Sequence, residues 1–323
     1  MRAWPTAAIG TALLVAAGCD TGSARSAEPP GSASAALVVP APAEPTQLAD
    51  VRRIAGGADS FVVTPRWSPT GDRLLLSGYR GVGLCVVDLG TLDLRWLDPA
   101  HVGRALWSPD GHSVAQAVAH AQGDWLLRDP LTGEAEHVLD PSFVPRRIAR
   151  FEGPADGEVL YDGNGRRTVY DEYHGRIVAW DGARRAVLED EDAAGPRVSL
   201  DGRRVAWWTG HLVAPTLHVA DAGGRMLFEG AGAQAAWLPD GERLVFADPV
   251  AGVGLQGAPI VAGAELRLLD LRDGTVTELT VTPDATEMEP AVSPDGARLA
   301  FADWASGSIL VGRLAGATAG GAP

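Results

Sequence analysis

One phrase returns along this chain, and it constrains the fold more than any other feature. The phrase joins a turn to a run of alternating apolar residues, and its copies read RWSPTGDRLLLSG, LWSPDGHSVAQA, FEGPADGEVLYDG, VSLDGRRVAWW, WLPDGERLVFAD and VSPDGARLAFAD. Their turn glycines, which lie 39 to 55 residues apart, are Gly71, Gly111, Gly157, Gly202, Gly241 and Gly296. Six copies at this period indicate a propeller or a solenoid.

The chemistry of the turn explains why each copy should fold locally. Proline presets the backbone at the second position, aspartate suits the third, and glycine supplies the positive φ that closes a type I turn with a bulge. Alternating residues follow the turn, as in residues 243–246. Each copy is therefore predicted to be a β-hairpin.

A second phrase follows each hairpin and supplies a third strand that ends in aspartate. It reads LCVVDL, WLLRDP, IVAWDG, LHVADA and LRLLDL in the first five repeats and degenerates to ILVGRL in the last. A turn such as LTGE or RDGT comes next, and then a fourth short strand, for example residues 276–279. Four antiparallel strands per repeat are typical of a propeller blade.

The two ends of the repeat region are complementary. The last repeat stops after Leu314 and lacks a fourth strand, and residues 315–323 are predicted to be a disordered tail. Upstream of the first repeat, residues 50–54 have the composition of a fourth strand without its own repeat.

The spacing supports this complementarity. Ile54 precedes Gly71 by 17 residues, and Leu279 precedes Gly296 by the same 17. We therefore expect an all-β, six-bladed β-propeller over residues 50–314, with four antiparallel strands per blade and the last blade closed by the N-terminal strand.

The first residues have the layout of an export signal. Arg2 is followed by an apolar stretch over residues 6–17 and then by Gly18 and Cys19. A charged start, a short apolar core and small residues at a cut site are typical of a secretory signal, and the core is too short to span a membrane. The junction resembles a bacterial lipoprotein signal, which implies that residues 1–18 are removed and that the Cys19 thiol is acylated. An ordinary signal peptide that happens to contain a cysteine is the alternative.

Residues 19–49 would then begin with the lipidated cysteine and continue as a tether. The segment reads CDTGSARSAEPPGSASAALVVPAPAEPTQLA, which is rich in Ala, Pro, Ser and Gly and has neither helical nor strand periodicity. We expect a disordered linker between a membrane surface and the folded domain.

Charge and cysteine content narrow the function. The formal net charge is −14, which argues against nucleic-acid binding because that depends on neutralising phosphates with basic residues. Once Cys19 is lipidated, Cys85 is the remaining cysteine and no intramolecular disulfide can form. Cys85 lies in an apolar run, which favours a buried, inert thiol.

The repeated phrases resemble the TolB-like, WD40-like propeller repeats. The resemblance rests on the turns at residues 68–71, 108–111 and 293–296 and on the strand that ends in aspartate, and it spans about residues 50–314. It implies a six-bladed propeller. Periplasmic TolB proteins carry an additional α/β domain before the propeller and contact a peptidoglycan-associated lipoprotein, but this chain has only the linker there, so that partner is not implied. The family's propellers also occur in peptidases and sugar-processing enzymes, so the fold does not select a function.

The sequence contains no G-x-S-x-G elbow, no H-E-x-x-H helix and no paired cysteine ligands. We therefore expect no catalytic residue, no metal and no cofactor. The acidic run at residues 189–192 could bind a cation together with Asp284, Glu287 and Glu289 from another link. The run lacks the alternating spacing of a calcium loop, however, and a solvated acidic loop is the favoured interpretation.

Two insertions between second and third strands depart from the otherwise even repeat. Residues 163–175 bring Tyr170, Tyr173 and His174 into one segment, which is either a binding loop or an exposed excursion of the third blade. Residues 248–264 are apolar, Gly-rich and uncharged after the initial aspartate. They would contact a partner, cover the channel as a lid, or fold back onto their own blade.

Propeller geometry would place both insertions on one face, together with the links from each fourth strand to the next blade. This face is the candidate functional surface. Its candidate partner- or ligand-binding residues are Tyr79, Arg80, His101, Arg104, Arg146, Arg147, Tyr170, Tyr173, His174, Arg197, His211 and Trp304.

These features predict a lipid-anchored, monomeric, non-catalytic binding module of the bacterial cell envelope, in the periplasm or at the outer-membrane surface. Its partner would be an envelope protein, a polysaccharide or a peptidoglycan-associated component, and its membrane contact would be the lipid anchor alone. The alternative is a carbohydrate- or peptide-processing enzyme, or a ligand sensor, with a site in the channel. A channel cluster of carboxylates, His and Arg would favour the alternative, whereas a flat face with exposed aromatic and apolar side chains would favour binding.

Overall fold

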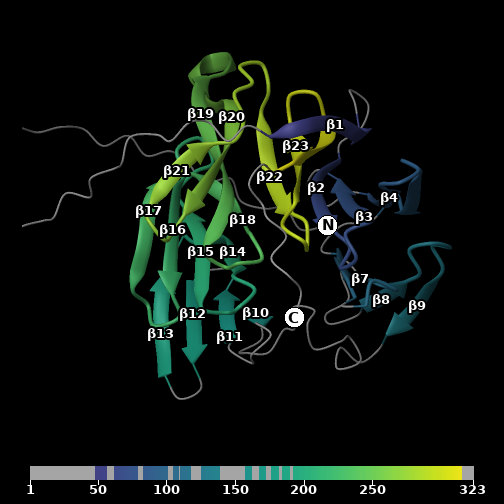
Figure 1. The fold of residues 1–323 in the computed structure, drawn as a ribbon, viewed down its shortest axis with the longest axis horizontal. Coiled ribbons are helices and arrows are strands. Elements are labelled where there is room, and N and C mark those ends of the chain that lie inside the picture. The colour runs from purple at the N-terminus through teal and green to yellow at the C-terminus, as the bar shows by residue number, and fades with distance from the viewer. Residues whose placement is uncertain are drawn as a thin grey trace, which may run out of the picture. The chain divides into compact units, whose positions relative to one another are not determined.

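The computed structural model describes residues 48–56, 62–78, 83–100, 105–108, 110–117, 125–138, 157–161, 167–171, 176–181, 184–189 and 192–314. These residues form β-strands, their turns and one short 3₁₀ turn, η3 (Leu255–Gly257). The strands make six four-stranded sheets (Figure 1), which confirms the all-β class and the expectation of four strands per sheet. Cys19, almost all of the linker and residues 315–323 lie outside the described residues. In the described ranges no helix is long and apolar enough to cross a membrane.

Each of the first five sheets is an antiparallel meander in chain order. The first strands of the six sheets are β2 (Val62–Trp67), β6 (Ala105–Trp107), β10 (Gly157–Tyr161), β14 (Ala194–Val198), β18 (Ala233–Trp237) and β22 (Glu287–Val292). The second strands are β3 (Arg73–Gly78), β7 (Val114–Ala117), β11 (Arg167–Asp171), β15 (Arg204–Thr209), β19 (Arg243–Val253) and β23 (Arg298–Asp303).

The outer half of each sheet consists of the third and fourth strands. The third strands are β4 (Leu84–Asp88), β8 (Trp125–Arg128), β12 (Arg176–Asp181), β16 (Thr216–Asp221), β20 (Pro259–Asp270) and β24 (Ser308–Arg313). The fourth strands are β5 (Leu94–Asp98), β9 (Ala135–Val138), β13 (Arg184–Glu189), β17 (Met226–Ala231), β21 (Thr275–Glu278) and, in the sixth sheet, β1 (Ala49–Gly56).

The N-terminal strand occupies the predicted place beside the last repeat. β1 pairs antiparallel with β24, and Arg313 on β24 forms an ion pair with Asp50 at 2.7 Å. Ile54 is buried in the core between the sixth sheet and the first. Arg52 also donates to the carbonyl of Leu89 in the first sheet at 3.3 Å. The strand therefore links the two ends of the repeat region.

The predicted turns form in five repeats. In each, the glycine amide donates to the carbonyl three residues earlier, and the glycines adopt φ values of 66° to 74°, which an L side chain rarely adopts. These turn glycines are Gly71, Gly111, Gly202, Gly241 and Gly296. The turn serines, where present, accept a second bond at Oγ from the amide five residues later.

The third repeat departs from the prediction. Gly157, which the spacing assigns to a turn, begins strand β10 and pairs with Asp171. The insertion at residues 163–175 is not a loop throughout, because its central part forms β11, which pairs with β10 on one side and β12 on the other. The sequence interpretation failed here because a segment flanked by glycines was taken as an excursion, although Thr168, Val169 and Tyr170 are residue types that favour strands.

Clusters of buried side chains join neighbouring sheets. They lie between the first and second sheets around Leu84, the third and fourth around Trp207, the fourth and fifth around Phe246, the fifth and sixth around Phe301, and the sixth and first around Leu74. Among the described residues, none of these clusters joins the second sheet to the third. Apart from the second and third sheets, consecutive sheets thus pack against each other, and the sixth sheet packs against the first.

A tryptophan before the turn makes a recurring bond between sheets. Its indole N–H donates to the carbonyl of the residue two positions before the turn in a neighbouring sheet. The bonds run from Trp67 to Ala291 at 2.7 Å, from Trp107 to Arg66 at 3.1 Å and from Trp237 to Arg197 at 2.9 Å. The contact between the first and sixth sheets is therefore of the same kind as that between consecutive sheets.

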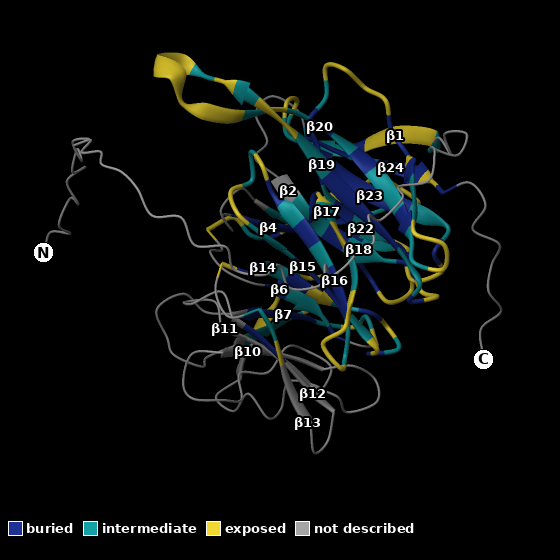
Figure 2. Cartoon of the chain, turned by 90° about the vertical axis from the view of Figure 1, so that its left-hand side faces the viewer, coloured by how far each residue is buried: buried dark blue, intermediate teal, exposed yellow. Residues whose placement is uncertain are grey.

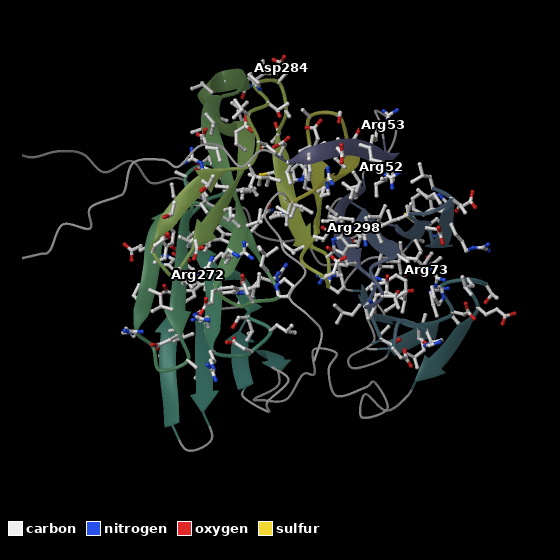
Figure 3. The ribbon with its side chains drawn as sticks, viewed as in Figure 1. Arg52, Arg53, Arg73, Arg272, Asp284 and Arg298 are labelled. Carbon is white, nitrogen blue, oxygen red and sulfur yellow. The ribbon has the colours of Figure 1, made fainter. Side chains whose placement is uncertain are left out.

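An arginine after the turn makes a second contact that is the same between the sixth and first sheets as between consecutive sheets. Arg204 of the fourth sheet donates to the carbonyl of Gly241 in the fifth at 2.7 Å, and Arg298 of the sixth donates to Gly71 in the first, also at 2.7 Å. The Arg298 guanidinium also lies 4.7 Å from the ring centroid of Trp67. Figure 3 labels Arg298, the first residue of β23, next to the first sheet.

The insertion at residues 248–264 forms a projecting two-stranded ribbon, which we call the arm. β19 and β20 continue their pairing past the sheet as far as Val253 and Pro259, and η3 closes the tip. Figure 2 shows the arm extending away from the sheets with exposed residues at its end. It does not fold back onto its own sheet, since Val253 is 80% and Leu255 93% exposed.

Candidate functional site

A cavity of about 420 Å³ lies among the first strands of four sheets. Its walls come from β2, β14, β18 and β22 and from the turns that follow the last three strands, where Leu200, Pro239 and Pro294 lie. These turns connect first to second strands, whereas the arm connects second to third strands. The cavity therefore reaches the end of the sheets opposite to the arm.

Three of these first strands carry a bulge at the same position. The register shifts after Ala194, Ala233 and Met288, and in each case the next residue has positive φ. These next residues are Gly195 (54°), Gln234 (52°) and Glu289 (53°). A bulge redirects side chains locally. Glycine adopts this conformation freely, but glutamine and glutamate do so at a cost in free energy, which is common at functional sites.

The two bulged polar residues bind each other across the fifth and sixth sheets. The Gln234 amide Nε2 donates to the Glu289 carboxylate Oε1 at 2.8 Å, and the Glu289 backbone N–H donates to Gln234 Oε1 at 2.9 Å. Both polar ends of the Gln234 side chain are thus engaged by one residue. This arrangement fixes the Glu289 carboxylate at the cavity wall.

Two arginines also line the cavity and carry positive charge. Arg66 on β2 and Arg197 on β14 lie two residues before their turns and line the cavity together with Glu289. Burial raises the pKa of the Glu289 carboxyl, while the positive charges of Arg197 and Arg66 act in the opposite direction. Arg197 Nη1 also donates to the carbonyl of Pro196 at 3.1 Å. Both guanidinium groups are therefore close enough to influence one carboxylate.

Those candidate residues from the sequence that the structure describes do not form one site. Arg197, expected in a link between blades, lies inside β14 and lines the cavity, because the strand continues to Val198. His211 is exposed between β15 and β16, and Trp304 is half-buried against the two cores that join the sixth sheet to the fifth and to the first. The backbone of Tyr170 lies in β11. The other candidates lie outside the described residues: Tyr79, Arg80, His101, Arg104, Arg146, Arg147, Tyr173 and His174.

Sequence reasoning missed Arg66 and Gln234, and it placed Glu289 in an acidic cluster. The signal was present in the register of the repeat, since Gln234 and Glu289 both lie four residues before the turn and Arg66 and Arg197 both lie two before it. What the sequence did not contain was the bulge that turns the fourth position toward the neighbouring sheet.

Of the acidic residues considered for a cation, Asp190 and Glu191 lie outside the described residues, and the described ones do not converge. Glu289 binds Gln234, Asp284 is exposed, and Glu287 is buried beside Thr280. In the part of the chain that the structure describes, no group of three or more His, Cys, Asp or Glu side chains could hold a metal ion.

Glu287 is a separate electrostatic feature. Burial raises the pKa of its carboxyl to about 7, against hydrogen bonds from Thr280 and Thr282 that favour the ionised form. The neighbouring carboxylates of Glu265 and Asp303 raise the pKa further. This residue lies near the base of the arm, because Ala264 and Thr286, which precede Glu265 and Glu287, form a bridge.

No protein family and no curated protein matches this sequence. Solved structures do resemble its fold. The β-propeller domain of Cps50 (Swd1) from Myceliophteria thermophila is 16% identical with a TM-score of 0.57, over 83% of this chain and 99% of that one. The gluconolactonase XC5397 from Xanthomonas campestris is 15% identical with a TM-score of 0.50, over 85% and 97%.

TolB from Acinetobacter baumannii is a further structural neighbour, 16% identical with a TM-score of 0.44 over 80% of this chain and 64% of that one. The neighbours thus include an enzyme and proteins that are not named as enzymes. At these identities the likeness concerns the fold alone, and that fold is an all-β, propeller-like arrangement of four-stranded sheets.

Proposed function

We propose that this chain is a closed six-bladed propeller, anchored in the bacterial envelope through a lipid on Cys19, that binds a partner protein through its arm and performs no chemistry itself. The observation that carries the proposal is the arm. It is a projecting ribbon whose exposed apolar residues are Val250, Val253, Leu255 and Ile260. An apolar protrusion of this kind is costly in water unless a partner covers it.

The free edges of the arm are also suited to pairing with an extended strand of another protein. β18 pairs with β19 only as far as Ala247, and β21 pairs with β20 only from Arg267 onward. Within the described chain, residues 248–253 and 259–263 therefore pair only with each other. Backbone groups on such free edges can accept an extended segment of another protein.

The closed ring of sheets and the lipid anchor on Cys19 are supported by different observations. The contacts of Trp67 and Arg298 between the first and sixth sheets support a closed ring, because they repeat the contacts between consecutive sheets. The anchor rests on Gly18 and Cys19 after the apolar core.

The test is affinity capture from the envelope of the source bacterium with the anchored protein as bait. Val253→Ser with Leu255→Ser should reduce partner recovery at least about tenfold, as expected when apolar interface anchors are lost. The matched control is Leu131→Ser with Val187→Ser, which removes two exposed apolar residues from other sheets. Equal recovery with both double variants and the unaltered chain would refute binding through the arm.

A second candidate function is favoured by the cavity. Arg66, Arg197 and Glu289 around one cavity would suit a ligand sensor or an enzyme that processes a carbohydrate or peptide. This candidate predicts turnover or ligand binding that survives the arm substitutions.

A further inference from the structure

We propose that the cavity among the first strands binds a carboxylate that is flanked by a hydrogen-bond donor, on a small molecule or at a chain end. Arg197 and Arg66 would hold the carboxylate, and Glu289 would accept from the adjacent N–H or O–H. This site is independent of the arm and lies at the other end of the sheets.

The arginines approach the cavity from two separated sheets. The sheets pack in the order first, sixth, fifth and fourth, so β2 and β14 bound the cavity with β22 and β18 between them. Guanidinium groups form paired, charge-assisted hydrogen bonds with carboxylates. Among the described residues, two arginines and one glutamate are the charged groups that line the cavity, in a chain whose net charge is −14. The two guanidinium groups make this a point where an anion can bind to an otherwise acidic protein.

The backbone conformation of Glu289 and its bonds to Gln234 fix the position of its carboxylate. Gln234 engages Oε1, which leaves Oε2 to accept from a ligand. Both residues adopt positive φ, at 52° and 53°, although neither is glycine. Burial raises the pKa of the Glu289 carboxyl, although the residue as a whole is half-buried.

A purely structural role explains only part of this arrangement. The bonds between Gln234 and Glu289 would hold the fifth and sixth sheets together. They do not require two arginines from other sheets to line the same cavity. The remaining walls are partly apolar, with Trp67, Val198 and Leu238 among the lining residues. Apolar walls beside charged groups strengthen the hydrogen bonds that those groups make.

The size and polarity of the cavity define the ligand class. A volume of about 420 Å³ lies within the range of small-molecule pockets. A free peptide C-terminus offers a carboxylate beside an amide N–H, and a uronic sugar offers a carboxylate beside hydroxyl groups. Both share the chemistry that the site selects.

Calorimetry on the full chain tests the proposal with two pairs of probes. N-acetyl-alanyl-alanine is compared with its C-terminal amide, and glucuronate with glucose. At least one acid should bind, and its neutral counterpart should bind at least about tenfold more weakly, because the charged hydrogen bonds are lost. Binding of the peptide alone assigns a chain end, binding of glucuronate alone assigns an acidic sugar, and binding of both assigns the shared carboxylate.

Arg197→Gln and Arg66→Gln should each weaken acid binding at least about tenfold with an unchanged melting temperature. Arg95→Gln, on the exposed fourth strand of the first sheet, is the matched control and should bind like the unaltered chain. The arm variant Val253→Ser with Leu255→Ser should also retain acid binding. The proposal is wrong if neither acid binds, if acids and neutral counterparts bind alike, or if folded Arg197→Gln and Arg66→Gln both retain full affinity.

Discussion

Glu287 is the residue whose ionisation should set the pH dependence of stability. In the folded chain burial raises the pKa of its carboxyl from 4.5 to about 7. Below about pH 4.5 both folded and unfolded chains hold the proton, so the residue contributes nothing. Between about pH 4.5 and about pH 7 the unfolded chain releases the proton first, and the free energy of unfolding falls as the pH rises. The full loss, at most about 3 kcal/mol, remains above about pH 7.

Glu287→Gln tests this linkage, because the amide keeps the shape of the side chain and removes the charge. The variant should be more stable than the unaltered chain near pH 8, and this advantage should shrink near pH 5. Urea unfolding at the two pH values measures the difference. Glu134→Gln, at an exposed position, is the control and should show no such change. An equal effect of Glu287→Gln at both pH values would contradict the assigned pKa.

The structural role of some residues could be predicted from the sequence, whereas the role of others could not. The turn glycines and serines were predictable, since a type I turn is decided by four neighbouring residues. The pairing of Gln234 with Glu289 was not, because it joins residues 55 positions apart through a bulge in each strand. Arg197 was singled out from the sequence, but for the wrong place in the sheet.

At the level of elements, the tryptophan before the turn should stabilise the contact between neighbouring sheets. Trp107→Phe removes the indole N–H that donates to the carbonyl of Arg66, while keeping most of the half-buried aromatic surface. We expect a loss of about 1 kcal/mol in the free energy of unfolding, typical of one hydrogen bond. Trp96→Phe is the control, since Trp96 is exposed on β5. Equal stabilities of the two variants would show that the bond adds nothing.

The two insertions show why elements were harder to predict than turns. Both were interpreted as loops because glycines interrupt them, and both contain strands: β11 in the first, and the extensions of β19 and β20 in the second. A strand that is already paired can be extended through residues of weak intrinsic preference, because β-propensity depends mainly on the neighbours of a strand. The apolar composition of residues 248–264 did not decide between an exposed segment and one folded back onto its sheet, and the structure shows that these residues project from the sheet.

For the whole molecule, the repeat period and the missing fourth strand predicted the order of the sheets. The sixth sheet packs against the first through Ile54, Trp67 and Arg298, which are distant in the sequence. What the repeats did not predict was the third sheet, where the weakest copy of the phrase supplies a strand in place of a turn.

The last prediction concerns β1, which joins the two ends of the repeat region. Deleting residues 49–56 removes Ile54 from the core and the ion pair between Asp50 and Arg313, and it leaves β24 as an unpaired sheet edge. The melting temperature should fall by roughly 5 °C or more, and the exposed edge should promote association measurable by size-exclusion chromatography. Deleting residues 22–45, assigned from the sequence to the linker, should leave both properties unchanged. If both truncated chains have the same melting temperature as the full mature chain, β1 does not hold the first and sixth sheets together. The proposal of a closed ring then loses its main support.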